Sequence, residues 1–435
     1  MKNYILQLGL LLVISIFTSC NSNSKGDKKE IANTNDYQRY LSNDTNKKLE
    51  NTKKEMLFWQ KKYDSSPNQY TYLIKLSSLY SQLFEITGQI ENLYTAEKLL
   101  LECNSRVKGE KASIHRAIAR NYISQHRFKE ALSYLEMALK LGEDKMDTQK
   151  MLFDVYMELG SFEKAKNQLT IFKNFNDFDY LIRLAKWNDH VGNLEDAIKV
   201  MEKAMTLTEN SNNIVQKEWI YSNIADFYGH AGRIEESYQY YLKTLELDNN
   251  NMYALKGIAW IAFSHDRNID KASKIVDFIQ TKHQVPDLYL FEADLYEFQN
   301  NNIGRENAIN KYLVKLQESN YGEMYNAYNV LLFSETLNKK NEAIKIAERE
   351  IQNRPTPESY DLLAWAYYNM GDFEKAYEIA KEFTINKSHE PNILFHNELI
   401  LKANNKLTNE NSNKVELIES LYELGPNLES QVKSI

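Results

Sequence analysis

Apolar residues recur along this chain at the three- and four-residue spacing of an amphipathic helix, in short runs separated by polar breaks. The stretch ESYDLLAWAYYNMGDFEKAYEIAKEF, residues 358–383, carries two such runs. They flank Gly371 and Asp372, a pair that is suited to end one helix and to cap the next. Alternating runs of β-branched residues are almost absent. The pattern therefore predicts an all-α protein built from paired short helices.

The same two-helix unit recurs at 112–141, 151–172, 181–207 and 221–248. A small residue in the second helix marks the period, and its positions are Ala131, Ala165, Ala197, Ser237, Ala272, Ala308, Ala343 and Ala376. Successive steps of 34, 32, 40, 35, 36, 35 and 33 residues scatter about the roughly 34 residues of a tetratricopeptide repeat. Eight units in register are strong evidence of an internal repeat.

The chain thus resembles a tetratricopeptide-repeat protein over about residues 67–385. The resemblance includes a small residue at the eighth position of several units, namely Ala119, Ala185, Ala225, Ala259 and Ala364. Two antiparallel helices approach closely only where a side chain is small, so the alanines of both helices are the expected packing residues. One hairpin leaves an apolar face uncovered. The resemblance therefore implies a right-handed superhelical solenoid with a concave and a convex side.

The N-terminal sequence MKNYILQLGLLLVISIFTSC has a short apolar run from Ile5 to Phe17, which is the form of a signal peptide. The end FTSC resembles the lipobox of bacterial lipoproteins, which implies lipidation of Cys20. The alternative is an ordinary signal peptide with an accidental cysteine. The Cys-Asn-Ser start and the Asn-, Lys- and Tyr-rich composition resemble exported lipoproteins of the Bacteroidetes, which implies the outer membrane and leaves the periplasmic or outer face open.

These signals predict five segments. We expect a signal peptide over 1–19, a lipidated cysteine with a flexible tether over 20–46, and a capping helix over 47–66. The repeat array is expected over 67–390. A degenerate repeat or C-terminal cap is expected over 391–435.

Charge and motifs exclude several classes of function. The net charge of −7 is mild and spread along the chain, which argues against nucleic acid as a partner. With Cys20 lipidated, Cys103 is left alone and no intrachain disulfide forms. No nucleophile elbow, phosphate loop, zinc helix or dinucleotide fingerprint occurs. The sequence therefore predicts no enzyme activity, no cofactor and no metal.

What remains is a surface that binds partners. In tetratricopeptide arrays the second, fifth, ninth, twelfth and thirteenth residues of each first helix face the concave groove. Carried over to this sequence, that geometry gives the candidate partner-binding residues Arg116, Arg120, Lys150, Trp219, Tyr253, Trp260, Phe263, Tyr325, Tyr328, Trp365 and Tyr368. The N-terminal half of this groove is charged and the C-terminal half is aromatic. For each aromatic residue, packing between repeats is the alternative to binding.

The sequence therefore favours a lipid-anchored envelope scaffold whose aromatic groove binds an extended or helical peptide segment of partner proteins. The alternative is a glycan-binding lipoprotein of the outer membrane. It would resemble the starch-utilisation surface proteins, which combine a lipidated cysteine, tetratricopeptide-like helices and aromatic sugar platforms. Those proteins carry long insertions between helices, whereas these repeats are nearly uninterrupted.

Overall fold

A computed structural model describes residues 30–42, 45–209 and 211–435 of the chain. Within these ranges every regular element is a helix, which confirms the predicted all-α class. The predicted signal peptide and Cys20 lie outside the described residues. None of the described helices is long and apolar enough to cross a bilayer.

Nine consecutive hairpins form the body of the described chain. Their helices are α3 (Tyr70–Thr87) and α4 (Glu91–Arg106), α5 (Ala112–Ser124) and α6 (Phe128–Leu141), α7 (Lys145–Glu158) and α8 (Phe162–Ile171), α9 (Phe178–His190) and α10 (Leu194–Glu209), α11 (Ile214–His230) and α12 (Ile234–Leu247), α13 (Met252–Trp260) and α14 (Ile269–Lys282), α15 (Asp287–Phe298) and α16 (Asn302–Glu318), α17 (Asn326–Glu335) and α18 (Lys340–Asn353), and α19 (Pro357–Met370) and α20 (Phe373–Phe383). The helix α13 continues into one turn of π-helix, η2 (Ile261–His265).

The α19/α20 hairpin shows why the repeat sequence folds in this way. The side chain of Thr356 accepts a hydrogen bond from the backbone N–H of Ser359 at the start of α19. Gly371 ends α19 with a φ of 92°, in the left-handed region that favours glycine. The Asp372 carboxylate then accepts the N–H of Lys375 at 3.1 Å and begins α20.

Alanine marks the crossing of the two helices in hairpin after hairpin. The side chains of Ala119, Ala131, Ala165, Ala185, Ala197, Ala225, Ala259, Ala272, Ala308, Ala343, Ala364 and Ala376 are all 0 % exposed. Larger apolar side chains fill the space beside them, and each hairpin packs on the next. The result is a superhelical solenoid of helix-turn-helix repeats, as expected.

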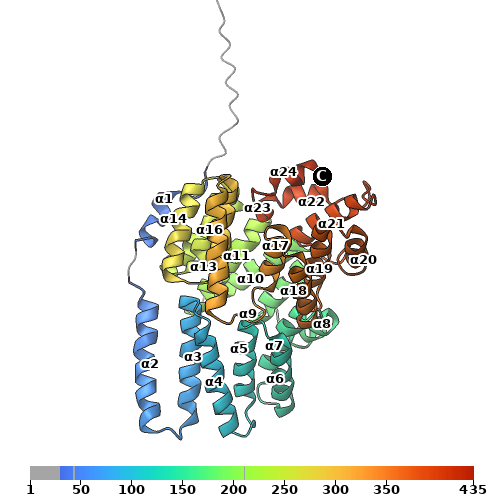
Figure 1. Cartoon of the computed structure of the whole chain (residues 1–435). Coiled ribbons are helices and arrows are strands. Elements are labelled where there is room, and N and C mark those ends of the chain that lie inside the picture. Colours follow the sequence, from blue (N-terminus) through green and yellow to red (C-terminus); the bar gives the residue numbers. More distant parts are fainter. Residues whose placement is uncertain (1–29, 43–44, 210) are drawn as a thin grey trace, which may run out of the picture.

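The superhelix closes on itself, so that hairpin turns of the first half contact loops that lie five or six hairpins further along the chain. The N–H of Gln284 donates to the carbonyl of Thr87 at 2.9 Å, and the Asn353 side chain donates to the carbonyl of His126 at 3.2 Å. In Figure 1, α3 to α8 form the lower row, and α13 to α20 lie above them. We call the contacts between hairpin turns of the first half and these distant loops the turn-to-turn contacts.

A glycine marks two further turn-to-turn contacts. A Cβ on Gly160 would lie 2.5 Å from the carbonyl oxygen of Pro355, and one on Gly192 would lie 2.8 Å from the ring of His389. Next to Gly160, Arg354 forms an ion pair with Glu158 at 3.1 Å. The two layers of the superhelix therefore approach at backbone distance, which only glycine permits.

The segment 30–42 does not match the flexible tether expected over 20–46. It contains α1 (Thr34–Tyr37) and the 3-10 turn η1 (Gln38–Tyr40), and it buries Ala32, Tyr37 and Tyr40 against α12, η2 and α14. We call it the N-terminal strap. The prediction of a flexible tether is wrong for residues 30–42, because a few apolar side chains within a polar sequence suffice to anchor this segment.

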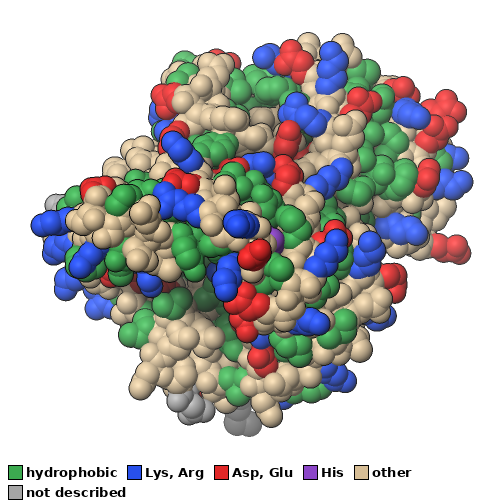
Figure 2. Space-filling view, turned by 90° about the horizontal axis from the view of Figure 1, so that it is seen from below, with side chains coloured by type: hydrophobic (Ala, Val, Ile, Leu, Met, Phe, Trp, Pro, Cys, Tyr) green, Lys and Arg blue, Asp and Glu red, His purple; other side chains and the backbone are tan. Residues whose placement is uncertain are grey.

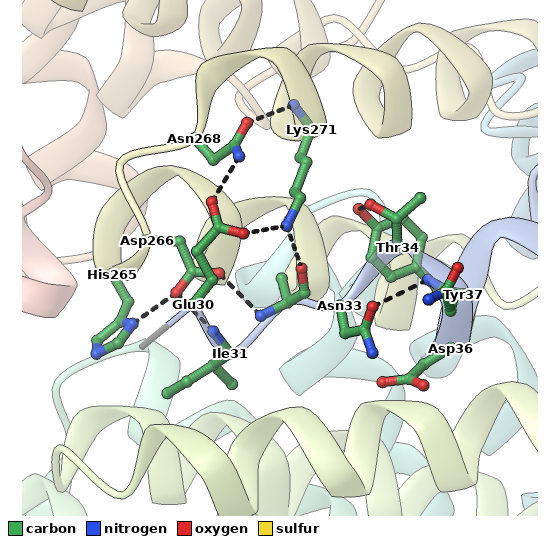
Figure 3. A network of polar contacts seen from close by, with 12 residues as sticks. Glu30, Ile31, Asn33, Thr34, Asp36, Tyr37, His265, Asp266, Asn268 and Lys271 are labelled. Carbon is green, nitrogen blue, oxygen red and sulfur yellow. Dashed lines mark hydrogen bonds and ion pairs between the residues drawn. The ribbon is translucent and has the colours of Figure 1, made fainter. Parts of the chain in front are cut away.

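Polar contacts fix the strap at the end of the π-helical turn (Figure 3). The Asp266 carboxylate accepts the N–H of Ile31 at 3.0 Å and that of Ala32 at 2.8 Å. Lys271 donates to Glu30 at 2.6 Å. Burial alone would raise the pKa of Asp266, but the hydrogen bonds from His265 and the two N–H groups outweigh it and hold the pKa below its usual value.

Helices outside the repeats cover both ends of the array. The helix α2 (Lys47–Ser65) lies against α3 at the N-terminal end. After α20 come α21 (Pro391–Ala403), α22 (Lys414–Glu419), α23 (Leu421–Leu424) and α24 (Glu429–Ser434). The segment 421–425 turns back toward the concave side and contacts α11 and η2.

Candidate functional site

The concave side of the superhelix holds a cavity of about 410 Å³ between α11, α13, α15, α17 and the segment 421–425. We call it the central cavity. The side chains that shape it include Asp226, Tyr253, Trp260, Asp294, Tyr328 and Tyr422. A concave site with mainly apolar walls and a few converging polar groups is the usual form of a binding pocket.

Aromatic rings form most of the wall. Trp260 packs against Phe291, with ring centroids 5.6 Å apart. Tyr253 and Tyr328 remain 55 % and 42 % exposed, so their rings are free to contact a ligand. The floor depends on Gly257, because a Cβ there would lie 2.2 Å from the ring of Tyr241.

The polar groups of the central cavity are mostly acidic. The Asp226 carboxylate accepts the hydroxyl of Tyr253 at 2.5 Å and that of Tyr241. Lys256 pairs with Asp287 at 2.6 Å. Burial, with the nearby Glu297 carboxylate in second place, raises the pKa of Asp294 to about 7.

The C-terminal segment forms one side of the central cavity. The carbonyl oxygen of Tyr422 accepts the indole N–H of Trp260 at 3.1 Å and the hydroxyl of Ser264 at 2.6 Å. Gly425 lies at the same edge of the indole, since a Cβ there would be 3.0 Å from Cη2 of Trp260. The edge of Trp260 that carries the N–H is therefore covered by the chain itself.

A second cavity of about 690 Å³ lies between α17, α19, α21 and the end of the chain. We call it the C-terminal cavity, and its walls include Glu335, Asp361, Trp365, Tyr368 and His396. Trp365 is stacked between Tyr368, at 4.8 Å, and His396, at 3.9 Å. Its indole N–H donates to Glu335 at 2.6 Å.

A third cavity of about 480 Å³ lies where the α9–α10 and α11–α12 turns meet the α20–α21 loop and α22. We call it the acidic cavity, because its walls include Asp189, Glu358, Glu390, Glu419 and Glu423. Burial is the first cause that raises the pKa of both Asp189 and Glu423. No group of side chains in the described part of the chain has the arrangement of a metal site.

The structure corrects four of the predicted groove residues. Arg116, Phe263, Tyr325 and Trp365 are only 8, 1, 7 and 6 % exposed, so they pack within the array and do not present a free surface. Arg116, for example, donates to the carbonyl of Glu143 at 2.7 Å and thereby joins two repeats.

The other predicted residues divide between the two halves of the groove. In the N-terminal half, Lys150 pairs with Asp177 and Asp179 at 3.1 and 3.0 Å, while Arg120 is exposed. Trp219 is 40 % exposed and meets Phe178 edge to face. In the C-terminal half, the central cavity collects Tyr253, Trp260 and Tyr328, and Tyr368 lines the C-terminal cavity.

Several cavity residues were absent from the prediction. Counting from Ala293 as the small eighth residue of its repeat, the second, fifth and ninth positions are Asp287, Leu290 and Asp294, and all three line the central cavity, whereas the twelfth and thirteenth, Glu297 and Phe298, do not. The repeat pattern thus contained a signal for them. It contained none for Tyr422 and Glu423, because the segment 421–425 lies outside the repeats.

Two family models match parts of the chain. The model described as tetratricopeptide repeat matches residues 220–251, and the model of subunit 3 of the anaphase-promoting complex, or cyclosome, matches residues 337–422. The first match covers most of the α11/α12 hairpin, and the second extends from α18 into α23. The chain therefore contains tetratricopeptide repeats, a class of repeat suited to protein–protein interaction and generally without catalytic activity.

Similar proteins are distant. A TPR repeat-containing protein of Methanocaldococcus jannaschii is 21 % identical over 359 residues, which are 74 % of this chain and 60 % of that protein. Thus the chain spans about 60 % of the length of this curated relative. Yeast Tom70 covers 92 % of this chain and 95 % of its own, at 14 % identity and a TM-score of 0.38.

Another solved structure that is similar is the human IFIT1 dimer with PPP-AAAA. It covers 72 % of this chain and 71 % of its own, at 15 % identity and a TM-score of 0.45. These likenesses concern the fold alone.

Proposed function

We propose that this protein is a lipid-anchored, non-enzymatic scaffold of the cell envelope that binds segments of partner proteins on the concave side of its solenoid. The observation that carries the proposal is the convergence of Tyr253, Trp260 and Tyr328 on the central cavity. Tyr253 and Trp260 come from α13, and Tyr328 comes from α17, two repeats further along the chain. Exposed aromatic rings give a large contact area at a small entropy cost, which makes them frequent binding hot spots.

The anchor is the second part of the proposal. A diacylglyceryl thioether and an N-acyl chain on Cys20 would give stable membrane attachment, whereas a single chain gives only reversible attachment. Ten residues from Cys20 to Glu30 span at most about 35 Å. Because the strap holds Glu30 on α14, this short connection would keep the α1 and α14 side of the solenoid near the membrane, which we expect to be the outer membrane.

Fatty-acid labelling tests the anchor. Cells that express the full chain and take up a labelled fatty acid should label the wild type and not Cys20→Ala. The variant should also leave the membrane fraction. Equal labelling of the two proteins would show that Cys20 is not the lipidation site.

Cross-linking in native membranes, followed by mass spectrometry, tests the binding site. The variant with both Tyr253→Ala and Tyr328→Ala should lose the cross-linked partners of the wild type. Phe175→Ala is the control, because Phe175 is 45 % exposed and lies in the turn between α8 and α9, far along the chain from the central cavity. Partner capture that survives the double substitution would contradict the proposal.

The glycan-binding alternative requires a flat aromatic face that is open to a sugar ring. Both faces of Trp365 are covered, and Trp260 packs against Phe263 and Phe291. Neither indole thus favours this alternative. Retention on insoluble polysaccharides that is lost with Tyr253→Ala and Tyr328→Ala would support it over a protein partner.

A further inference from the structure

The three cavities lie next to one another. The central and acidic cavities share His230 and Glu423, and the acidic and C-terminal cavities share Glu358 and Glu390. An extended segment that lies along this side of the protein would therefore pass one cavity after the next. We call the three together the acidic channel.

The charge of the protein is concentrated in this channel. Eleven Asp and Glu side chains line it, against Lys256, Arg354 and four histidines. Of the 53 basic and 60 acidic residues in the chain, this leaves 51 basic and 49 acidic elsewhere. Positive and negative side chains are indeed interspersed on the outer face that Figure 2 shows.

The two cations of the channel are already engaged. Lys256 pairs with Asp287 at 2.6 Å, and Arg354 pairs with Glu350 at 2.6 Å and with Glu158 at 3.1 Å. Most of the channel carboxylates therefore have no permanent positive charge beside them in the described part of the chain.

Burial and crowding raise the pKa values of two of these carboxylates, Glu390 and Asp294. Burial, followed by the carboxylates of Glu423, Asp189 and Glu358, raises the pKa of Glu390 to about 7. In Asp294 burial acts together with Glu297 and Glu335. A cation placed among such groups removes an unfavourable interaction as well as forming favourable ones.

An independent observation also indicates a missing ligand. The Asp361 side chain is 6 % exposed and its Oδ2 contacts His396 Nδ1 at 2.8 Å. Its Oδ1, however, is buried without any hydrogen-bond partner. A buried acceptor without a donor is costly. Asp361 lines the C-terminal cavity beside Trp365 and Tyr368, where an ammonium or guanidinium group would supply the donor and also contact aromatic rings.

We propose that the acidic channel binds an extended, lysine- and arginine-rich segment of a partner protein. The inference rests on the proposed scaffold function and names the chemistry of the partner. Aromatic walls would hold the aliphatic stems of the basic side chains, and the carboxylates would hold their charged ends.

Fluorescence anisotropy with labelled peptides of equal length tests this proposal on the full chain. One peptide alternates lysine and arginine with small residues, a second has glutamate at the basic positions, and a third has glutamine there. The basic peptide should bind at least tenfold more tightly than the other two, and its affinity should fall as salt is added. Equal binding of all three would overturn the proposal.

Charge-matched variants then locate the binding. The channel variant combines Asp294→Asn, Glu390→Gln and Glu423→Gln. The control variant removes the same number of carboxylates from the outer surface, with Glu163→Gln, Glu246→Gln and Glu348→Gln, three residues that are exposed, and both are measured at pH 8, where the channel carboxylates are mostly ionised. We expect the channel variant to bind the basic peptide at least tenfold more weakly and the control to stay within twofold of the wild type. Equal loss in both variants would overturn the proposal.

The result is separable from the test of the scaffold function. If envelope partners cross-link in a way that depends on Tyr253 and Tyr328 while the basic peptide does not bind, the scaffold function is supported and the binding of a basic segment is refuted. If neither partners nor peptides bind, both proposals fall.

Discussion

Alanine substitutions at two glycines test whether the turn-to-turn contacts stabilise the closed superhelix. Gly160 and Gly371 occupy equivalent turns in two repeats, with φ angles of 65° and 92°. Alanine in such a left-handed conformation costs about 1–2 kcal/mol at either position. The surroundings differ, because a Cβ on Gly160 would meet the Pro355 carbonyl oxygen at 2.5 Å, whereas Gly371 has nothing within 4 Å.

The additional cost of Gly160→Ala comes from moving the facing loop. Ordinary contact begins at 3.4 Å, so the loop must retreat by about 0.9 Å. That movement weakens the ion pair of Arg354 with Glu158 and the hydrogen bond from Asn353 to His126. At about 1–1.5 kcal/mol for each partly buried contact, Gly160→Ala loses about 2–3 kcal/mol more than Gly371→Ala.

Amide hydrogen exchange measures this difference in stability at the affected loop itself. Global unfolding of a repeat array does not, because it is not a single two-state transition. Exchange over residues 351–356 should quicken roughly 30- to 140-fold in Gly160→Ala, the factor that corresponds to about 2–3 kcal/mol. In Gly371→Ala the same peptides should exchange at the wild-type rate. Equal exchange over 351–356 in the two variants would refute the turn-to-turn contact as an energetic link.

Three further predictions concern the channel, the strap and the core. Because burial raises the pKa of Asp294 to about 7, the folded state binds more protons than the unfolded state between about pH 4 and 7, so this carboxyl lowers stability as pH rises through that range. In thermal unfolding, Asp294→Asn should match the wild type only below about pH 4 and should be the more stable protein at pH 8, by at most about 4 kcal/mol and by less in proportion to the contact of this carboxyl with water. Asp266→Ala removes the acceptor of two strap N–H groups, and exchange over residues 31–41 should rise by about tenfold or more while the repeats keep their protection. Phe263→Ala should lower stability by about 3–5 kcal/mol and Phe175→Ala by less than about 1 kcal/mol, since the first side chain is 1 % exposed and the second 45 %; similar melting temperatures for the two would mean that Phe263 is not buried.

The repeats were predictable because the causes of the hairpin lie within one unit. A small residue such as Ala364, an N-cap such as Thr356 and a turn glycine such as Gly371 act on neighbours a few residues away or across one hairpin. The spacing of these residues along the chain is therefore enough to predict the hairpins.

The free surface was less predictable, because burial in a closed superhelix depends on contacts between distant segments. Trp365 satisfied the inward-facing rule, yet one of its faces is covered by His396 of α21, which lies outside the repeats. Trp260 is covered by the segment 421–425, more than 160 residues away. The strap was missed for a similar reason, since Tyr37 and Tyr40 become anchors only where α12 and α14 offer a surface.

The turn-to-turn contacts stabilise the closed superhelix, whereas the carboxylates of the acidic channel repel one another and destabilise it. Turn-to-turn contacts hold the superhelix narrow, and burial inside it raises the pKa values of Glu390, Glu423 and Asp189, while the Asp189 carboxylate adds to the rise in the other two. Widening it would let water screen these charges but would break the contacts at Gly160 and Gly192. A basic segment removes the repulsion without breaking those contacts. Partner binding should therefore stabilise the closed form, and hydrogen exchange over residues 351–356 should slow when the basic peptide is bound, although that loop belongs mainly to the turn-to-turn contacts.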